Sequence, residues 1–224
     1  MDEFGARTIG VIGGTGPQGR GLAYRWAAAG LPIVIGSRDA ARAESVATAL
    51  NDRSRAYGSR VRGLANHDCA SAADLVIVAV PWEGHAATVE PLRDALAGKI
   101  VVDCVNPLGF DKQGPYALAV AEGSAAAQAA ALLPESIVVA AFHHVSAVLL
   151  GDESVDKVDT DVLVLGDDRA AVDEVIALAG RIPGMRGVYG GRLRNAGQVE
   201  ALTANLIAIN RRYTAHAGIR ITDL

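Results

Sequence analysis

A glycine-rich turn close to the amino end constrains this chain more than any other feature. Thr8–Gly13 is a short apolar run typical of a buried strand, and an alanine-rich helical stretch follows the turn. Between them lies Gly14-x-Gly16-x-x-Gly19, a spacing that turns a strand tightly into a helix whose amino end can meet a pyrophosphate. Strand, glycines and helix together are the context that dinucleotide binding requires. We therefore predict a dinucleotide-binding unit, and a plain glycine-rich turn is the alternative.

The end of the second expected strand indicates which dinucleotide binds. NAD-binding sheets carry an acid there for the ribose 2′-hydroxyl, whereas here Pro32–Ile35 runs into Ser37 and Arg38, and Arg42 follows one helical turn later. A hydroxyl and two guanidinium groups suit a 2′-phosphate through charge-assisted hydrogen bonds, so NADP is favoured. The alternative is that both arginines are solvated and that Asp39, a natural N-cap, is the ribose acid displaced by one position.

Length, charge and cysteine usage narrow the class of protein. The 224 residues, half of them hydrophobic, fit one large α/β domain or a nucleotide domain with a small appendage. The net charge of −4 argues against nucleic acid as a partner, and no apolar run reaches membrane-spanning length. Residues 1–7 lack the features of a signal peptide, and Cys69 and Cys104 have no metal-site spacing. We expect a cytoplasmic protein without a membrane partner and without a metal.

Strand-like and helix-like segments alternate along the first 141 residues. Asp74–Val80 is an unbroken run rich in β-branched residues, which is typical of a strand buried on both faces. The alternation predicts an α/β fold, a Rossmann-like doubly wound parallel sheet, with residues 1–141 as the NADP-binding domain. Further strands are expected at 61–64, 99–104 and 136–141, helices at about 40–55, 83–96 and 123–133, and a loop at 106–115.

From about Phe142 the elements become fewer. We expect strands at 160–165 and 184–189 and helices at 169–181 and 196–216. This part is too small for a core of its own, so we predict that residues 142–224 form a small C-terminal α/β part that packs on the first and completes a second-substrate pocket. The last helix has Val199, Leu202, Leu206 and Ile209 on one stripe, which predicts a homodimer contact.

The ligand crevice of such a sheet lies at the carboxyl ends of its strands. The residues that directly follow strands are 80–82, 106–107 and 143–147. His143 follows its strand immediately and is the candidate for ligand contact, with a satisfied structural histidine as the alternative. His67, His85 and His216 have no metal-site spacing, so structural or solvent-facing roles are expected for them.

Several motifs together resemble one family over nearly the whole chain. Gly36-Ser37-Arg38 combined with Val80-Pro81-Trp82-Glu83 is similar to the F420-dependent NADP reductases, as are Gly13–Gly19, Lys99–Val102, Gly166–Asp168 and Glu200–Thr203. The resemblance implies hydride transfer between NADP(H) and the deazaflavin coenzyme F420, a co-substrate. It implies 2′-phosphate contacts by Thr15, Ser37, Arg38 and Arg42, pyrophosphate contacts by the Gly14–Gln18 backbone, and nicotinamide neighbours at Val80, Trp82, Asn106 and Ala147. His143 and Thr203 would border the deazaflavin.

The implied set of cofactor-binding residues is thus Gly14, Thr15, Gly16, Pro17, Gln18, Ser37, Arg38, Arg42, Val80, Trp82, Asn106, His143, Ala147 and Thr203. The chain departs from the family's pattern on the deazaflavin side, at His144, Ser146, Asn106 and Ala201. Between Gly184 and Ile221 lie six arginines and one acid, Glu200, and we expect Arg192 and Arg194 among the arginines to attract the phosphate and glutamate tail of F420. A solvated or subunit-contacting face is the alternative.

Hydride transfer between two carbon centres needs mainly two rings held about 3–3.5 Å apart in a dry pocket. We therefore expect no catalytic side chain, with His143 as the one candidate. Two other classes of function stay open, an NADPH-dependent reductase of a flavin, ferric chelate or imine, and a non-catalytic NADP(H)-sensing module. The physiological direction of transfer does not follow from the sequence, because the same residues serve both directions.

Overall fold

The structure is a computed structural model and describes residues 7–54 and 60–224. The first six residues, on which the cytoplasmic expectation partly rests, and Arg55, the expected end of the second helix, lie outside these ranges.

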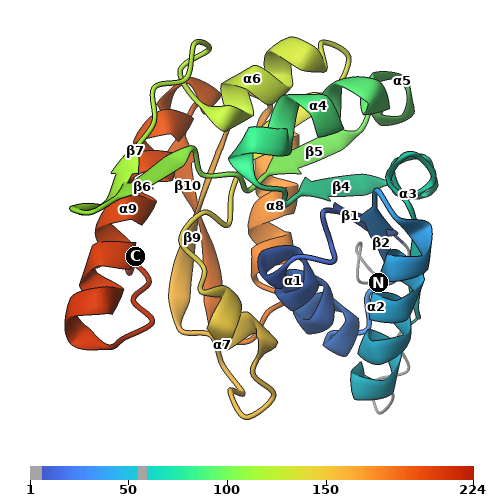
Figure 1. Ribbon diagram of the computed structural model, residues 1–224, viewed down its shortest axis with the longest axis horizontal. Coiled ribbons are helices and arrows are strands. Elements are labelled where there is room, and N and C mark those ends of the chain that lie inside the picture. Colours follow the sequence, from blue (N-terminus) through green and yellow to red (C-terminus); the bar gives the residue numbers. More distant parts are fainter. Residues whose placement is uncertain (1–6, 55–59) are drawn as a thin grey trace.

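An eight-stranded sheet runs through the described part of the chain in the order β10-β9-β8-β5-β4-β1-β2-β3 (Figure 1). Its neighbouring strands are parallel except for β8 and β9. Every residue of β1 and β4 is buried, because helices cover both faces of the sheet. The strands are β1 (Ile9–Ile12), β2 (Ile33–Ser37), β3 (Val61–Ala65), β4 (Leu75–Val78), β5 (Ile100–Asp103), β8 (Ile137–Ala140), β9 (Thr160–Gly166) and β10 (Met185–Gly191).

Helices form a layer on each face of the sheet (Figure 1). The first layer contains α1 (Pro17–Ala28), α2 (Ala40–Ser54) and α8 (Arg169–Ala179), with α7 (Ala147–Gly151) packed on α1. The second contains α3 (Asn66–Ala72), α4 (His85–Val89), α5 (Arg93–Leu96), α6 (Ala125–Leu132) and the beginning of α9 (Ala196–Tyr213). The predicted doubly wound α/β fold is confirmed.

The carboxyl-terminal part extends the same sheet. β9 pairs with β8 in the antiparallel sense, and β10 continues parallel to β9, so the hydrophobic core crosses residue 142 without a break. We expected residues 142–224 to pack on the sheet. Their strands instead join the sheet edge, where they satisfy the hydrogen-bonding groups of β8. The domain division at residue 142 stays a prediction.

Two expected elements differ from the structure. The single helix expected at 83–96 is broken into η2 (Trp82–Gly84), α4, η3 (Glu90–Leu92) and α5, because Pro91 has no N–H to continue the helical ladder. The loop expected at 106–115 contains a hairpin, β6 (Leu108–Asp111) and β7 (Gly114–Ala117). Its turn is held by Asp111 Oδ1, which accepts the N–H groups of Gln113 and Gly114 at 2.7 and 3.2 Å. The hairpin packs on α9.

Candidate functional site

The glycine-rich turn brings the amino end of α1 against the ends of β1 and β4. Gly13 has a φ of 76°, and a Cβ there would lie 2.4 Å from the carbonyl oxygen of Ala79. A Cβ on Gly19 would lie 2.9 Å from the carbonyl oxygen of Gly13, so a side chain there would prevent this close packing of α1 on the turn. The left-handed residue of the turn is therefore Gly13, one position before the Gly-x-Gly-x-x-Gly spacing begins.

The backbone donors of this turn are divided between the fold and the crevice. The N–H of Gly14 donates to the carbonyls of Val11 and Gly36 at 3.1 and 3.2 Å, and the N–H of Gly16 donates to Gly13 at 2.9 Å. These two glycines were expected to offer N–H groups to a pyrophosphate, but the fold already uses those groups. The N–H groups of Gln18 and Gly19, in the first turn of α1, have no partner within the helix and are the donors that remain.

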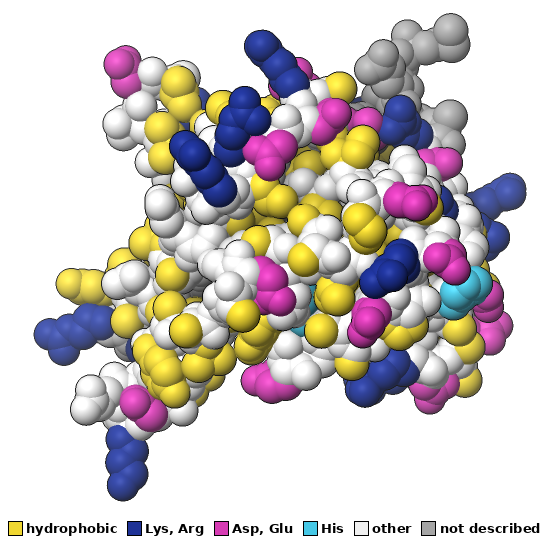
Figure 2. Space-filling model, turned by 90° about the horizontal axis from the view of Figure 1, so that it is seen from above, with side chains coloured by type: hydrophobic (Ala, Val, Ile, Leu, Met, Phe, Trp, Pro, Cys, Tyr) yellow, Lys and Arg dark blue, Asp and Glu magenta, His cyan; other side chains and the backbone are white. Residues whose placement is uncertain are grey.

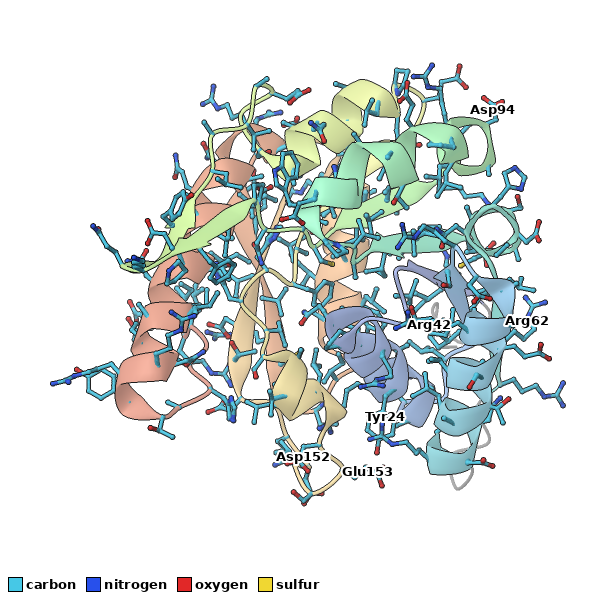
Figure 3. The ribbon with its side chains drawn as sticks, viewed as in Figure 1. Tyr24, Arg42, Arg62, Asp94, Asp152 and Glu153 are labelled. Atoms are coloured by element: carbon cyan, nitrogen blue, oxygen red, sulfur yellow. The ribbon has the colours of Figure 1, made fainter. Side chains whose placement is uncertain are left out.

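The four residues expected to contact the 2′-phosphate line one cavity of about 440 Å³ at this edge of the sheet, namely Thr15, Ser37, Arg38 and Arg42. Both arginines are exposed, and Arg42 lies between α1 and α2 in Figure 3. Asp39 Oδ1 accepts the N–H groups of Ala41 and Arg42 at 3.0 and 3.2 Å, so this carboxylate caps α2. The expected N-cap role of Asp39 is present, and the choice between a 2′-phosphate and a ribose contact at this end stays a prediction.

Sequence reasoning missed three polar residues of the same cavity, Asn66, Glu83 and Thr88. Asn66 Oδ1 is buried and has no hydrogen-bond partner among the described residues. Asn66 begins α3 directly after β3, so the rule that strand ends line the crevice would have found it had α3 been expected.

A second cavity of about 510 Å³ continues from the first, because Gly16, Ala79, Val80 and Pro81 line both. We call the two cavities together the trough. Seven further residues of the predicted set line this second cavity, namely Pro17, Gln18, Trp82, Asn106, His143, Ala147 and Thr203. It is also lined by five residues that the sequence did not single out, namely Cys104, Val105, Phe142, Val145 and Ile207. Of the predicted set, only Gly14 does not line the trough among the described residues.

Hydrogen bonds tie the polar residues of the second cavity to one another. Asn106 Nδ2 donates to the carbonyl of His143 at 3.2 Å, and the Thr203 hydroxyl lies 3.2 Å from Asn106 Oδ1 and 3.3 Å from the same carbonyl. These contacts join the end of β5, the segment after β8 and α9. Asn106 and Thr203 therefore hold the walls of the cavity in place as well as lining it.

His143 is held in this cavity by an unusual backbone conformation. The preceding Phe142 has a φ of 63°, which a bulky residue adopts only when its surroundings hold it, and its buried ring meets Trp26 edge-on at 5.5 Å. His143 is 5 % exposed, and neither ring nitrogen has a hydrogen-bond partner among the described residues. Burial lowers the pKa of His143 to about 4, against an opposing effect of the Asp103 charge. The imidazole is therefore neutral near pH 7, and its contact with a ligand stays a prediction.

The arginines after Gly184 do not form one basic rim, contrary to the expectation. Arg186 and Arg220 both pair with the buried Asp161, at 2.7 and 2.6 Å. Arg192 lies 3.5 Å from Asp167 and lines a separate surface hollow beside Gly166. None of the described residues that line this hollow lines the trough. Arg211 is the arginine that continues the α9 side carrying Thr203 and Ile207.

Two further observations concern metals and membranes. Within residues 7–54 and 60–224, no three His, Cys, Asp or Glu side chains gather in a way that suits a metal ion. No helix in the same ranges has the length and apolar character to cross a membrane.

Comparison with known proteins gives consistent results. Residues 8–107 match the profile of a family described as "NADP oxidoreductase coenzyme F420-dependent". The F420-dependent NADP reductase of Methanothermobacter thermautotrophicus is 40 % identical over 96 % of this chain and 95 % of its own length, and that of Methanocaldococcus jannaschii is 38 % identical over 96 % and 98 %. A solved structure from Arthrobacter sp. FB24, a provisional F420-dependent NADP reductase, superimposes with a TM-score of 0.78 at 28 % identity, covering 97 % of this chain and all of that one. The rat metalloreductase STEAP3 is 30 % identical over 90 % of this chain but only 37 % of its own length.

Proposed function

The chain belongs to the F420-dependent NADP reductase family, and we propose that its trough holds NADP(H) and coenzyme F420 with their reacting rings together at the second cavity. The protein is an oxidoreductase that passes a hydride between these two molecules. The observation that carries the placement is the continuity of a polar, arginine-bearing cavity with a more apolar one across Val80 and Pro81.

The first cavity suits the phosphate groups of NADP. Ser37, Arg38 and Arg42 provide a hydroxyl and two guanidinium groups for the 2′-phosphate, while Asp39 Oδ1 is directed to the first N–H groups of α2. The amino end of α1, with Gln18 and Gly19, provides backbone donors for the pyrophosphate. Thr15 lies between these two groups along the chain and lines the same cavity. These contacts orient one end of a long molecule and leave its nicotinamide end to the second cavity.

The second cavity suits two stacked rings. Trp82, Val80, Ala147 and Ile207 provide apolar walls, and the neutral imidazole of His143 provides hydrogen-bonding nitrogens that the fold leaves free. The two bound molecules would supply the chemistry, a hydride exchanged between the nicotinamide and deazaflavin rings together with one proton exchanged with solvent. The residues themselves bind the rings, orient them and exclude water, so no side chain has to act as a nucleophile.

The experiment that tests this function is anaerobic mixing of the protein with NADPH and F420. We expect the absorbance of oxidised F420 to disappear with NADPH and to persist with NADH. A ferric chelate and FMN serve as competing acceptors, the chelate because of the relationship to STEAP3. Faster reduction of either acceptor than of F420 would replace the deazaflavin assignment with a general NADPH reductase. NADPH binding without any hydride transfer would indicate a sensing module.

We also propose a homodimer formed through α9. Of the predicted stripe, Val199 and Leu206 are buried within the chain's own fold, while Leu202 and Ile209 are 38 % and 40 % exposed. Tyr213, one turn further, is 72 % exposed. Figure 2 shows hydrophobic side chains gathering toward the left of that view, the side on which Figure 1 places α9 and the hairpin. Light scattering at micromolar concentration should give twice the chain mass, and Ile209→Glu should reduce it to one chain.

A cytoplasmic location is the last part of the proposal. It is supported by the two cysteines, Cys69 and Cys104, which are buried and free. Fractionation of source cells checks it, and recovery of the protein outside the cytoplasm would contradict it.

A further inference from the structure

Trp82 is part of the wall of the second cavity, and what lies behind it is unexpected for a hydrophobic core. Its indole ring stacks on the ring of His85 with centroids 5.6 Å apart and planes inclined by 26°. His85 has no exposed surface, and neither has its partner Asp103. Imidazole Nε2 and carboxylate Oδ2 are 2.7 Å apart. The cavity therefore has a buried histidine–carboxylate pair directly behind its tryptophan.

The same carboxylate reaches a second part of the cavity lining. Asp103 is the last residue of β5, and its Oδ1 accepts the N–H of Val105 at 3.0 Å. Val105 and its neighbours Cys104 and Asn106 all line the second cavity. The two oxygens of one buried carboxylate thus connect the support of Trp82 with the turn that leaves β5.

The surroundings of His85 favour its doubly protonated form. Its Nδ1 lies 2.9 Å from Gln128 Oε1, and the amide of Gln128 is oriented because its Nε2 donates to Glu122 Oε2 at 3.3 Å. Both imidazole nitrogens therefore face acceptors, and a neutral ring has only one N–H to offer them. Burial opposes this state, but the bond to Asp103, with Gln128 and the charge of Glu200, raises the pKa of His85 above its usual value of 6.5.

A buried ion pair is a costly way to fill this space. Apolar side chains of similar volume are often equally stabilising or better, because they avoid the desolvation of two charges. The pair does fix the orientation of its side chains, because each of its hydrogen bonds sets an angle that an aliphatic contact leaves free. Direction matters at the wall of a cavity that has to hold two rings face to face.

We propose that His85 and Asp103 form a positioning pair for hydride transfer. The imidazole fixes the plane of Trp82, and the carboxylate fixes the Val105 turn, so that the pair sets the spacing between two parts of the wall that confine the reacting rings. Neither residue lines the second cavity within the described ranges, so both act through their neighbours. The catalytic part of this proposal rests on the proposed function, whereas the placement of Trp82 does not.

The test replaces the pair without leaving a buried charge. The double variant His85→Leu/Asp103→Asn keeps an oxygen for the Val105 N–H and should remain folded, as thermal unfolding would show. We expect kcat for F420 reduction by NADPH to fall about 10- to 100-fold, because small displacements of stacked rings have effects of that size. The Kd for NADP⁺ should be nearly unchanged, since its phosphate contacts lie in the first cavity. The control is His67→Leu, an exposed histidine on α3.

The tryptophan signal gives a second readout that needs no F420. The chain has two tryptophans, so the difference in emission between each protein and its Trp82→Phe counterpart isolates Trp82. A stacked, protonated imidazole quenches indole emission, and the double variant should therefore show severalfold stronger Trp82 emission. If the unmodified enzyme fails to reduce F420, the proposed function falls, but this emission difference still decides the placement of Trp82.

Three outcomes would overturn the positioning pair. The first is an unchanged kcat in the folded double variant, and the second is unchanged Trp82 emission. The third is loss of the fold in both the double variant and the single Asp103→Asn variant, which would make the pair a general element of stability. If only the double variant fails to fold, kcat and Trp82 emission are measured on Asp103→Asn instead, and unchanged values there would overturn the positioning pair.

Discussion

At the phosphate end of the trough, Ser37, Arg38 and Arg42 stand at the ends of a strand and a helix, and both arginines are exposed. At the other end, Asn106 and Thr203 bond to each other and to the backbone of His143, whose side chain is almost entirely buried. The charged groups of the first cavity are solvated, whereas the polar groups of the second cavity are hydrogen-bonded to one another. The ring-binding end presents no arginine or lysine to the cavity within the described residues.

The difference fits the two ligands that we propose for the trough. A 2′-phosphate keeps its charge, and exposed guanidinium groups bind it without a large desolvation cost. Hydride transfer instead needs a dry site, in which any unpaired polar group is costly. The first region can therefore be assembled from a few adjacent residues, while the second needs β5, the segment after β8 and α9 to meet.

The largest expected effect comes from the residue that joins the two regions. The Arg25 guanidinium on α1 donates to the carbonyls of Leu149, Leu150, Asp152 and Val155 at 2.7 to 2.9 Å and so holds α7, whose Ala147 lines the second cavity. Figure 3 shows Asp152 and Glu153 beside Tyr24 of α1 at this junction. Arg25→Met should reduce the free energy of unfolding by about 3–4 kcal/mol, because several carbonyls lose their donor together.

Chemical denaturation measures this loss, and the same variant tests the separation of the two regions. If α7 loosens, F420 turnover should fall more than NADP⁺ affinity. The comparison variant is Arg53→Met, which removes an ion pair with Glu153, one hydrogen bond to the carbonyl of Gly151 and a contact with the Tyr24 ring at a more exposed site, and it should cost about 1–2 kcal/mol. Equal losses in the two variants would contradict the role given to Arg25.

The second prediction uses the titrating groups of the buried region. Burial lowers the pKa of His143 to about 4, so the unfolded chain binds more protons between pH 4 and 6.5, and stability rises with pH there. Burial raises the pKa of Glu200 from 4.5 to about 7, against two backbone N–H bonds, so the folded chain binds more protons and stability falls with pH over 4.5–7. The effects of His143 and Glu200 on the pH dependence of stability therefore have opposite signs.

Replacing Glu200 should leave the pH dependence that His143 causes without its opposing effect. In Glu200→Gln the free energy of unfolding should rise by about 3 kcal/mol between pH 4.5 and 6.5, because the His143 effect is no longer offset. Denaturation at a series of pH values measures this slope, with the exposed His67→Gln as control. The raised pKa of His85 acts above pH 6.5, outside this window. A flat profile in Glu200→Gln would refute the opposition of the two groups.

The third prediction concerns the exposed region. Arg38→Ala should weaken NADP(H) binding by about 1.5–3 kcal/mol, or roughly 10- to 150-fold, because one charge-assisted contact is lost. Affinity for NAD(H), which has no 2′-phosphate, should stay the same. Titration calorimetry with both cofactors measures the ratio, and Arg169→Ala, an exposed arginine beside the separate hollow, is the matched control. Parallel losses for NADP(H) and NAD(H) would argue against a phosphate contact.

The smallest effect concerns the acidic tail of F420. The Arg211 side chain lies near Gly114 of the hairpin, one helical turn beyond Ile207, which lines the second cavity. Arg211→Ala should raise the KM for F420 by an amount equivalent to about 1 kcal/mol or less, and the effect should vanish near 1 M salt, where screening reaches about 3 Å. Arg192→Ala should leave this KM unchanged. A larger effect for Arg192 would restore the basic rim expected from composition.

Local sequence was sufficient for one half of the site. The glycine-rich turn, the Ser37-Arg38 pair and Arg42 lie within a few residues of a strand end, and a single rule, that strand ends line the crevice, brings them together. The family resemblance led to Trp82, His143 and Thr203 as well. Hydrophobic periodicity also located the parallel strands, because a strand buried on both faces has a run of apolar residues that few other elements share.

Tertiary structure decided the features that depend on segments far apart in the chain. The antiparallel β9, the separation of Arg192 from Arg211 and the burial of His85 on Asp103 follow from which strand edge and which helix face were available after folding. The sequence does not distinguish a solvated histidine from a buried one, and only the packing around the side chain determines its protonation state. The chemistry of the phosphate end is therefore evident from the order of residues, while that of the ring-binding end arises from long-range contacts.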